Sequence, residues 1–330
     1  MRLHSGLDTR QLVQILGETL IKEHQQWKPK FYKTQSTTNE MTGHERDAAV
    51  TWLLILNTKF HFTPETQGLA ISLVDRFLLL VKVRPKYLHC VAICCLYIAA
   101  KTLEEDEVIP STTDLVKDSQ CGLTVAEILR MEAIILNKLS WDIKTVTCVD
   151  YLHTIHAMLM YYYPQLLDEL RDMTPSKHLG EMTRKLFHCL CYHPLMVHRP
   201  VTLTLAVISL ELEQITPCWL SIIYTLQQMA EVDNESLIHC RELAGRHLTA
   251  KHILPSGYTF KTNTTAVVRN MKRKVEQSEV DSDDVYASIK QLYCEDTEKI
   301  TSPVRASCRS EMHRDTEVDN CLPLPTVSAN

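Results

Sequence analysis

The sequence predicts an all-α protein. Apolar residues recur at helical spacing through most of the first 250 residues, and the alternation typical of β-strands never persists. Glycine is scarce, with 8 residues in a chain of 330, and few turn dipeptides occur, which disfavours an all-β sandwich. The length allows about two domains of ordinary size. We therefore expect helices grouped into more than one domain.

The first expected helix covers residues 7–26, where Leu12, Leu16 and Leu20 share one stripe. Residues 28–43 are polar and aperiodic, so we expect a loop there. A first series of helices is then expected at 45–58, 64–81, 85–101, 110–118 and 124–139. The last four of these starts carry a signal: Pro64, Pro85 and Pro110 at the first helical position, and Thr124 followed three residues later by Glu127.

A second series of five helices is expected at 147–160, 176–192, 200–214, 217–229 and 234–250. The two series resemble each other weakly. Pro85 and Pro200, 115 residues apart, each precede a long uncharged run. A helix that is apolar on all sides is buried on all sides. Each series is thus expected to wrap its other helices around one central helix, as in a duplicated five-helix domain.

Four regions follow from this organisation: an N-terminal helix and loop (1–43), two helical domains (44–142 and 143–254), and a C-terminal tail (255–330). In the tail, Pro, Ser and Thr increase and charges come in blocks, which predicts disorder. The segment 283–294 is an exception, because its apolar residues have helical spacing. It is a candidate helix that forms on a partner.

Composition excludes several classes of function. The net charge of −5 and pI near 6.3 argue against a nucleic-acid-binding protein. The widely spaced glycines exclude phosphate-binding and dinucleotide-binding loops. The uncharged run from Leu88 to Ala100 is shorter than the roughly 17–25 residues that span a bilayer, so no membrane partner is expected. Residues 1–20 lack a secretory signal, and several of the 12 cysteines lie in apolar runs. We expect a reducing compartment, the nucleus and cytoplasm.

No catalytic signature is evident, so we expect no enzyme, no small-molecule substrate and no cofactor. His153 and His156 could orient two imidazoles toward a metal, but spacing offers no third ligand. The densest cluster of metal-ligating types comprises His188, Cys189, Cys191, His193 and His198. Its first members share a helical stripe with leucine and phenylalanine, which favours core packing over zinc binding.

Several charged residues lie inside apolar stripes. Arg46, Asp75 and Glu132 are each flanked by apolar neighbours on an expected helix. A buried charge must be paired, because leaving it alone costs several kcal/mol. Lys101 ends the first central helix, where a cation also suits the helix dipole.

These charges belong to four motifs, whose order and spacing resemble the cyclin box over about 100 residues. The motifs are Arg46 with Trp52-Leu53, Val74-Asp75-Arg76-Phe77-Leu78, Ile98-Ala99-Ala100-Lys101 with Glu104-Glu105, and Leu129-Arg130-Met131-Glu132 with Leu139-Ser140-Trp141-Asp142. The second series matches the C-terminal cyclin fold by pattern. Stretches of the tail resemble the I type, so the sequence is similar to the atypical G/I branch of cyclins.

The resemblance implies two tandem cyclin-box folds and a non-catalytic subunit that binds a cyclin-dependent Ser/Thr kinase. By similarity, Lys101 and Glu132 form the polar pair that meets the kinase near its C-helix, while Leu136, Trp141 and Ile143 pack on it. Such a subunit positions the C-helix and activation loop, and so regulates the cell cycle or cell survival. The resemblance makes the neuronal-type kinase a candidate partner, with cell-cycle kinases next.

Arg46 and Asp75 match a buried ion pair that ties the first helix of the box to the second, a structural role. The sequence departs from the family at the face that docks substrates in cell-cycle cyclins. Its positions here are Glu45, Ala48, Ala49, Ile55 and the retained Trp52. Small and charged residues make a poor apolar groove, so docking of that kind is not expected.

The tail carries two candidate regulatory features. Lys272-Arg273-Lys274 could serve nuclear import, and Ser302, which precedes a proline, is a possible phosphorylation site. Two other functions stay open. One is a cyclin-fold adaptor or scaffold that activates no kinase. The other is a cyclin-fold transcription factor, which the negative net charge disfavours.

Overall fold

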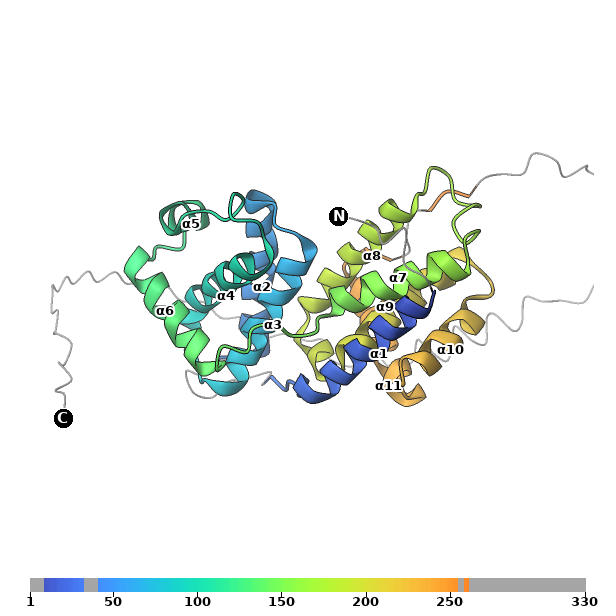
Figure 1. Ribbon diagram of the computed structural model, residues 1–330, viewed down its shortest axis with the longest axis horizontal. Helices are drawn as coiled ribbons and strands as arrows, with labels where there is room; N and C mark the ends of the chain where they lie inside the picture. Colours follow the sequence, from blue (N-terminus) through green and yellow to red (C-terminus); the bar gives the residue numbers. More distant parts are fainter. Residues whose placement is uncertain (1–8, 33–40, 255–257, 261–330) are drawn as a thin grey trace, which may run out of the picture. The chain divides into compact units, whose positions relative to one another are not determined.

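The computed structural model describes residues 9–32, 41–254 and 258–260. Over these residues the secondary structure is helical, apart from one isolated bridge between Leu170 and Phe260, and the all-α prediction is confirmed (Figure 1). The candidate helix at 283–294, the basic cluster at 272–274 and Ser302 lie outside the described residues. The domain boundaries drawn from the sequence stay predictions.

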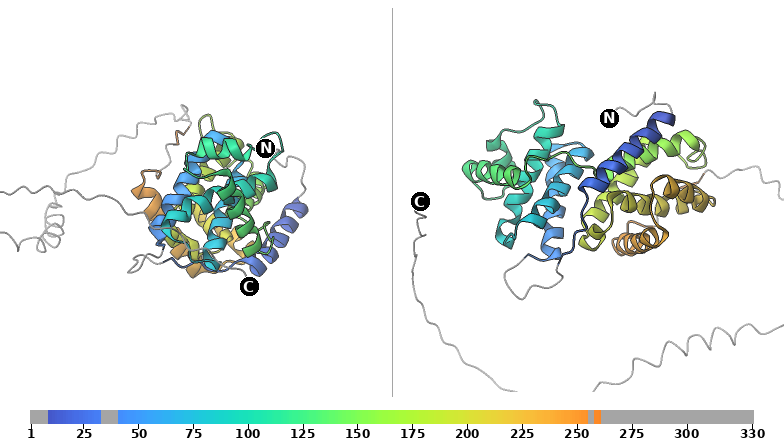
Figure 2. Two further views of the ribbon diagram at one scale, coloured as in Figure 1. Left: turned by 90° about the vertical axis from the view of Figure 1, so that its left-hand side faces the viewer. Right: turned by 60° about the horizontal axis from the view of Figure 1, so that its bottom comes forward.

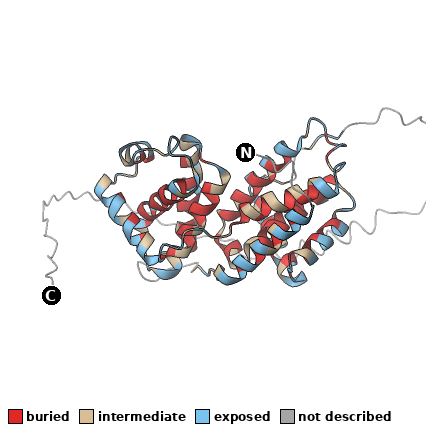
Figure 3. Ribbon diagram, in the orientation of Figure 1, coloured by how far each residue is buried: buried red, intermediate tan, exposed pale blue. Residues whose placement is uncertain are grey.

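The first bundle surrounds one buried helix, α4. It consists of α2 (Gly43–Phe60), α3 (Pro64–Leu80), α4 (Leu88–Leu103), α5 (Thr112–Ser119) and α6 (Val125–Lys138). Every residue of α4 from Cys90 to Ala100 is buried, and Figure 3 shows this helix in red among its partly exposed neighbours. The core also holds Leu53 of α2 and Phe77 of α3. The central helix expected from the sequence is therefore observed.

By length and composition alone, the helical stretch Pro85–Leu103 could cross a membrane, although it has charged residues near its ends. In the structure, 67% of its most apolar part is buried inside the protein. Its hydropathy is that of a helix whose whole circumference packs against other helices.

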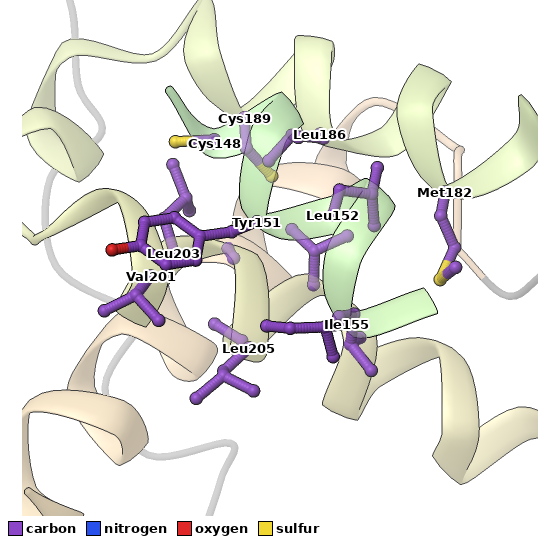
Figure 4. Close-up of a cluster of buried hydrophobic side chains, with 14 of the residues drawn as sticks. Cys148, Tyr151, Leu152, Ile155, Met182, Leu186, Cys189, Val201, Leu203 and Leu205 are labelled. Carbon is purple, nitrogen blue, oxygen red and sulfur yellow. The ribbon is translucent and has the colours of Figure 1, made fainter. Parts of the chain in front are cut away.

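The second bundle repeats this arrangement around α9. It consists of α7 (Cys148–Tyr162), α8 (Pro175–Leu190), α9 (Pro200–Ile215), α10 (Trp219–Met229) and α11 (Asn234–Ala250). Figure 4 shows how Leu203 and Leu205 of α9 meet Tyr151, Leu152 and Ile155 of α7 in the core. All five of these side chains are buried.

Helix α1 (Thr9–Gln26) packs on the second bundle although it precedes the first in sequence. Its buried Leu12, Leu16 and Leu20 belong to the core formed by α7 to α11. The ribbon views show α1 lying along α7 (Figures 1 and 2). The sequence predicted this helix but gave no partner for it.

Local sequence signals explain where the helices begin. Thr42, Thr124 and Thr147 form capping boxes with the acidic residue three positions later. Three starts that the sequence placed at a proline lie further on. Pro217 precedes α10, which begins at Trp219. Pro85 opens a 3₁₀ turn (Pro85–Tyr87) and the α-helix begins at Leu88. The helix expected from Pro110 begins at Thr112, because the Ser111 hydroxyl accepts the Asp114 N–H as the N-cap.

The segment 258–260, which lies within the predicted tail, contacts the second bundle. The Arg171 N–H donates to the Thr259 carbonyl over 2.8 Å, and Tyr258 packs beside Leu167, Leu170 and Ile215. At least these three residues of the tail region are anchored to the folded part.

Candidate functional site

Lys101 and Glu132 meet between the end of α4 and the middle of α6. The Lys101 ammonium forms an ion pair with the Glu132 carboxylate and lies 4.4 Å from the centre of the Tyr97 ring. The Lys101 side chain is 38% exposed and that of Glu132 is 11% exposed. The more deeply buried carboxylate therefore holds the ammonium of a lysine whose side chain is partly exposed.

Exposed apolar side chains lie close in sequence to the two members of this ion pair. Leu103 follows Lys101 at the end of α4, Val108 lies in the next loop, and Leu129 lies one turn before Glu132; each is at least 43% exposed. Exposed apolar groups beside a held charge are typical of a surface that binds another protein.

The three apolar residues predicted to contact a kinase lie in different environments. Leu136 and Ile143 are half-buried and pack against the first core. Trp141 is 68% exposed, immediately after α6. Ser140 and Trp141 both have left-handed backbones, with φ of 53° and 59°. Left-handed geometry at a non-glycine residue costs of order 1–3 kcal/mol, so the turn holds the indole on the surface at a conformational cost.

Glu104 connects the end of α4 to the start of α3. Its carboxylate accepts hydrogen bonds from the Thr63 N–H over 2.7 Å and from the Thr63 hydroxyl over 2.9 Å. Thr63 is the N-cap of α3. Glu104, a residue of the same sequence motif as Lys101, thus forms hydrogen bonds within the first bundle.

Arg46 and Asp75 form a buried, bidentate ion pair between α2 and α3. Two guanidinium nitrogens of Arg46 donate to the two Asp75 oxygens, each over 2.9 Å. The Tyr32 hydroxyl also donates to Asp75, over 2.6 Å. Burial would raise the pKa of Asp75, but the charges of Arg46 and Lys30 outweigh it and lower that pKa. The pair is closed to solvent.

Arg46 also reaches the second bundle, which the sequence did not predict. Its third guanidinium nitrogen donates to the Leu190 carbonyl at the end of α8 over 2.5 Å. Nearby, Asp47 of α2 accepts a hydrogen bond from His193 over 2.7 Å. One turn of α2 therefore supplies two polar contacts to the other bundle.

Sequence reasoning also missed a buried polar cluster in the second bundle. Lys185 of α8 and Tyr258 both bond to the Glu211 carboxylate of α9, and His178 lies 3.7 Å from it. The His178 ring is 3.1 Å from His156 of α7. A signal was present, because Glu211 directly follows the uncharged run of α9 and a charge there needs a partner.

The sequence matches the family model "Cyclin, N-terminal domain" over residues 15–144, which include Lys101, Glu132, Arg46 and Asp75. Human Cyclin-I2 is 39% identical over 202 residues, covering 61% of this chain and 55% of that protein. Pig (Sus scrofa) Cyclin-G1 is 35% identical over 210 residues, covering 63% of this chain and 69% of that protein.

Among solved structures, the X-ray structure of a viral cyclin from herpesvirus saimiri superposes with a TM-score of 0.58. The two chains are 18% identical, and the match covers 72% of this chain and 99% of the viral one. It supports the fold.

The chain belongs to the cyclin family. Its curated relatives place it with the G and I types, which confirms the branch indicated by the sequence motifs.

Proposed function

We propose that this protein is a non-catalytic regulatory subunit that binds a cyclin-dependent Ser/Thr kinase. Its membership of the cyclin family supports this role. The observation that carries the proposal is the partly exposed Lys101–Glu132 ion pair, with exposed Leu103, Val108 and Leu129 nearby in sequence.

The mechanism is differential binding to one kinase conformation. Lys101 has an ammonium whose remaining protons can satisfy carbonyl groups at the end of a kinase helix. Glu132 keeps that ammonium in place, and the exposed apolar groups bury against the kinase. A kinase C-helix held inward brings its glutamate to the catalytic lysine. The subunit thus raises activity by favouring a state that the kinase already samples.

The neuronal-type cyclin-dependent kinase is the first candidate partner, and cell-cycle kinases are the next. The proposed outcome is regulation of the cell cycle or of cell survival, in the nucleus and cytoplasm. The buried thiols of α4 support a reducing compartment.

A second candidate function is an adaptor that binds a kinase without stimulating it. The α2 face favours it, because Ala49 is buried, Glu45 bonds to the Thr42 cap, and Trp52 meets the His89 ring edge-on at 4.8 Å. Ile55 is 59% exposed and Trp52 is partly buried, so the apolar surface of this face is limited to these two side chains and Ala48.

The test is binding and activation of a panel of purified cyclin-dependent kinases by the full chain. We expect Lys101→Ala and Glu132→Ala each to weaken binding by about 2–5 kcal/mol, at least ~30-fold in Kd, because each leaves the other charge unpaired. Lys86→Ala is the matched control. The Lys86 ammonium also lies over a tyrosine ring, 4.8 Å from the centre of Tyr87, but Lys86 is not part of the Lys101–Glu132 ion pair.

Binding and stimulation by the wild type, both reduced in the two variants and kept in the control, would establish the activator. Binding without stimulation would establish the adaptor. Binding that is unchanged in both variants would reject the Lys101–Glu132 surface, and no binding to any kinase would reject the proposed function.

A further inference from the structure

Three metal-ligating side chains meet where α2 contacts the second bundle. His44 and Asp47 come from the first turns of α2, and His193 opens the 3₁₀ turn His193–Val197. His193 Nδ1 lies 2.7 Å from Asp47 Oδ2, and one ligand atom from each residue lies within 4.8 Å of the others. None of the three belongs to the Lys101 surface.

The His193 imidazole is held in a fixed orientation. A Cβ atom at position 43 would lie 2.4 Å from His193 Cδ2, so glycine is what allows the start of α2 to lie against the ring. The Tyr32 and His44 rings also meet it edge-on, at 6.4 and 5.3 Å between centres. The residue is buried. A preformed ligand orientation lowers the cost of binding a metal.

The donor set suits a zinc-class cation. Zinc binds histidine nitrogen and carboxylate oxygen at about 2.0–2.2 Å in a tetrahedron, which separates neighbouring ligand atoms by roughly 3.3 Å. The His193–Asp47 contact need open only slightly to admit the ion. His44 is exposed and can turn its ring inward to supply the third ligand.

The surroundings complete the site. The second oxygen of Asp47 accepts a hydrogen bond from Arg46 over 3.2 Å, and Asp75 balances the Arg46 charge. Carboxylate ligands of metals are commonly oriented by such a partner. His44 and Asp47 also line a hollow of about 820 Å³ that extends to α8 and α11, which gives an ion and its water a route in.

We propose that His44, Asp47 and His193 bind one Zn²⁺ ion, with water in the fourth position, and that the ion fastens the second bundle to α2. In the sequence, His193 belongs to the cluster of histidines and cysteines at 188–198, for which the pattern favours core packing over zinc binding. Its partners in the structure lie about 150 residues away in sequence, where no local spacing can show them.

The test is titration of the full chain, purified free of metal, with ZnCl₂ in a calorimeter and with CoCl₂ by visible absorption. We expect one equivalent of Zn²⁺ to bind and tetrahedral absorption bands to appear with Co²⁺. We also expect the melting temperature to rise with zinc concentration, because binding favours the folded state.

The decisive variants are His44→Ala and Asp47→Asn. Changes to residues that merely orient a ligand cost about 10–100-fold in metal affinity, so loss of a ligand should cost at least ~100-fold and remove the zinc-dependent rise in melting temperature. His44 is exposed, so its removal should leave the fold intact, which circular dichroism would verify. The matched control is the double variant His198→Ala/His239→Ala. It removes another pair of adjacent imidazoles, 3.2 Å apart, and should bind zinc as the wild type does.

Two results would overturn the proposal. One is the absence of stoichiometric zinc binding by the wild type, which would leave His193 and Asp47 as an ordinary hydrogen-bonded pair. The other is equal affinity in the wild type and the folded His44→Ala variant, which would mean that the zinc binds elsewhere.

Discussion

Arg46 makes more polar connections than its place in the family motif implies. Its guanidinium joins Asp75 of α3, Asp47 of its own helix and the Leu190 carbonyl of α8. The pairing with Asp75 could be predicted, because an arginine inside an apolar stripe needs a carboxylate nearby. The bond to Leu190 could not be predicted, since every residue has a main-chain carbonyl and the sequence does not show which one accepts the bond.

Breaking this pair should be costly. We expect Arg46→Ala to lower the free energy of unfolding by about 3 kcal/mol, because buried Asp75 loses its bidentate partner and keeps only Lys30, at 3.6 Å, and the Tyr32 hydroxyl. Urea denaturation would measure the loss. Arg171→Ala is the control, since the Arg171–Asp172 pair is largely exposed and should contribute little. A loss of similar size in the two variants would contradict this account.

The buried pair His156 and His178 should make the second bundle sensitive to acid. Burial lowers the pKa of His156 to about 3 and of His178 to about 4; nearby His178 and His153 add to the first effect and Lys185 to the second. Both rings are thus neutral in the folded state. In the unfolded chain they take up protons near pH 6.5, so stability is full above that pH and falls as the pH drops toward 4.

We expect each histidine to cost about 1.4 kcal/mol of unfolding free energy per pH unit below 6.5. Urea titrations at pH 7, 6 and 5 would measure the slope for the wild type and for His156→Gln/His178→Gln, in which it should be much shallower. The exposed His61 provides the control substitution. An equally steep slope in the double variant would show that other groups cause the acid sensitivity.

At the scale of the helices, the starts were more predictable than the partners. Thr124 and Glu127 indicate the start of α6, because they can form a capping box. Pro200 indicates the start of α9, because its fixed backbone angle suits the first turn of a helix. The stripe of Leu12, Leu16 and Leu20 shows that α1 buries one face. It does not show which helix covers that face, because every amphipathic helix offers a similar one.

Glu23 explains how α1 is fixed to α9. The start of α9 has no side-chain cap of its own, and the Glu23 carboxylate accepts the Val201 N–H over 3.0 Å and pairs with Arg199. Glu23 is 1% exposed. A residue of a distant helix thus acts as the cap and places a negative charge at the positive end of the α9 dipole.

Glu23→Ala should therefore destabilise the second bundle. We expect a loss of about 2–3 kcal/mol in unfolding free energy, because a charge-assisted hydrogen bond disappears and a buried N–H loses its acceptor. Glu18→Ala on the same helix is the control, since Glu18 bonds to the exposed Gln14 side chain one turn away. Equal losses would indicate that α1 contributes only helix propensity.

At the scale of the folded part, the two bundles are joined by apolar and by polar contacts. Val50 of α2 and Ile71 of α3 are buried in the core of the second bundle. The polar contacts run from Arg46 and Asp47 of α2 to Leu190 and His193. The duplication was visible in the two uncharged runs. The polar contacts that join the halves were not, because they link residues more than a hundred positions apart.

We expect the two bundles to unfold together. Leu53→Ala in the first core and Leu152→Ala in the second should each cost about 3 kcal/mol, since both side chains are fully buried. Scanning calorimetry should show one transition in the wild type, shifted as a unit by either substitution. Two separated transitions, each moved by only one of the variants, would show that the joining contacts are weak.

The placement of α1 has a consequence for the newly made chain. Helix α1 ends 122 residues before α7, the helix on which it packs, begins. At roughly 5–20 residues per second, that interval lasts on the order of 6–25 seconds. During this time the first bundle can be completed, while the helix that seals the second has nothing to cover it. The first helix to be made can therefore dock only after α7 has emerged, and until then its apolar stripe is open to a chaperone.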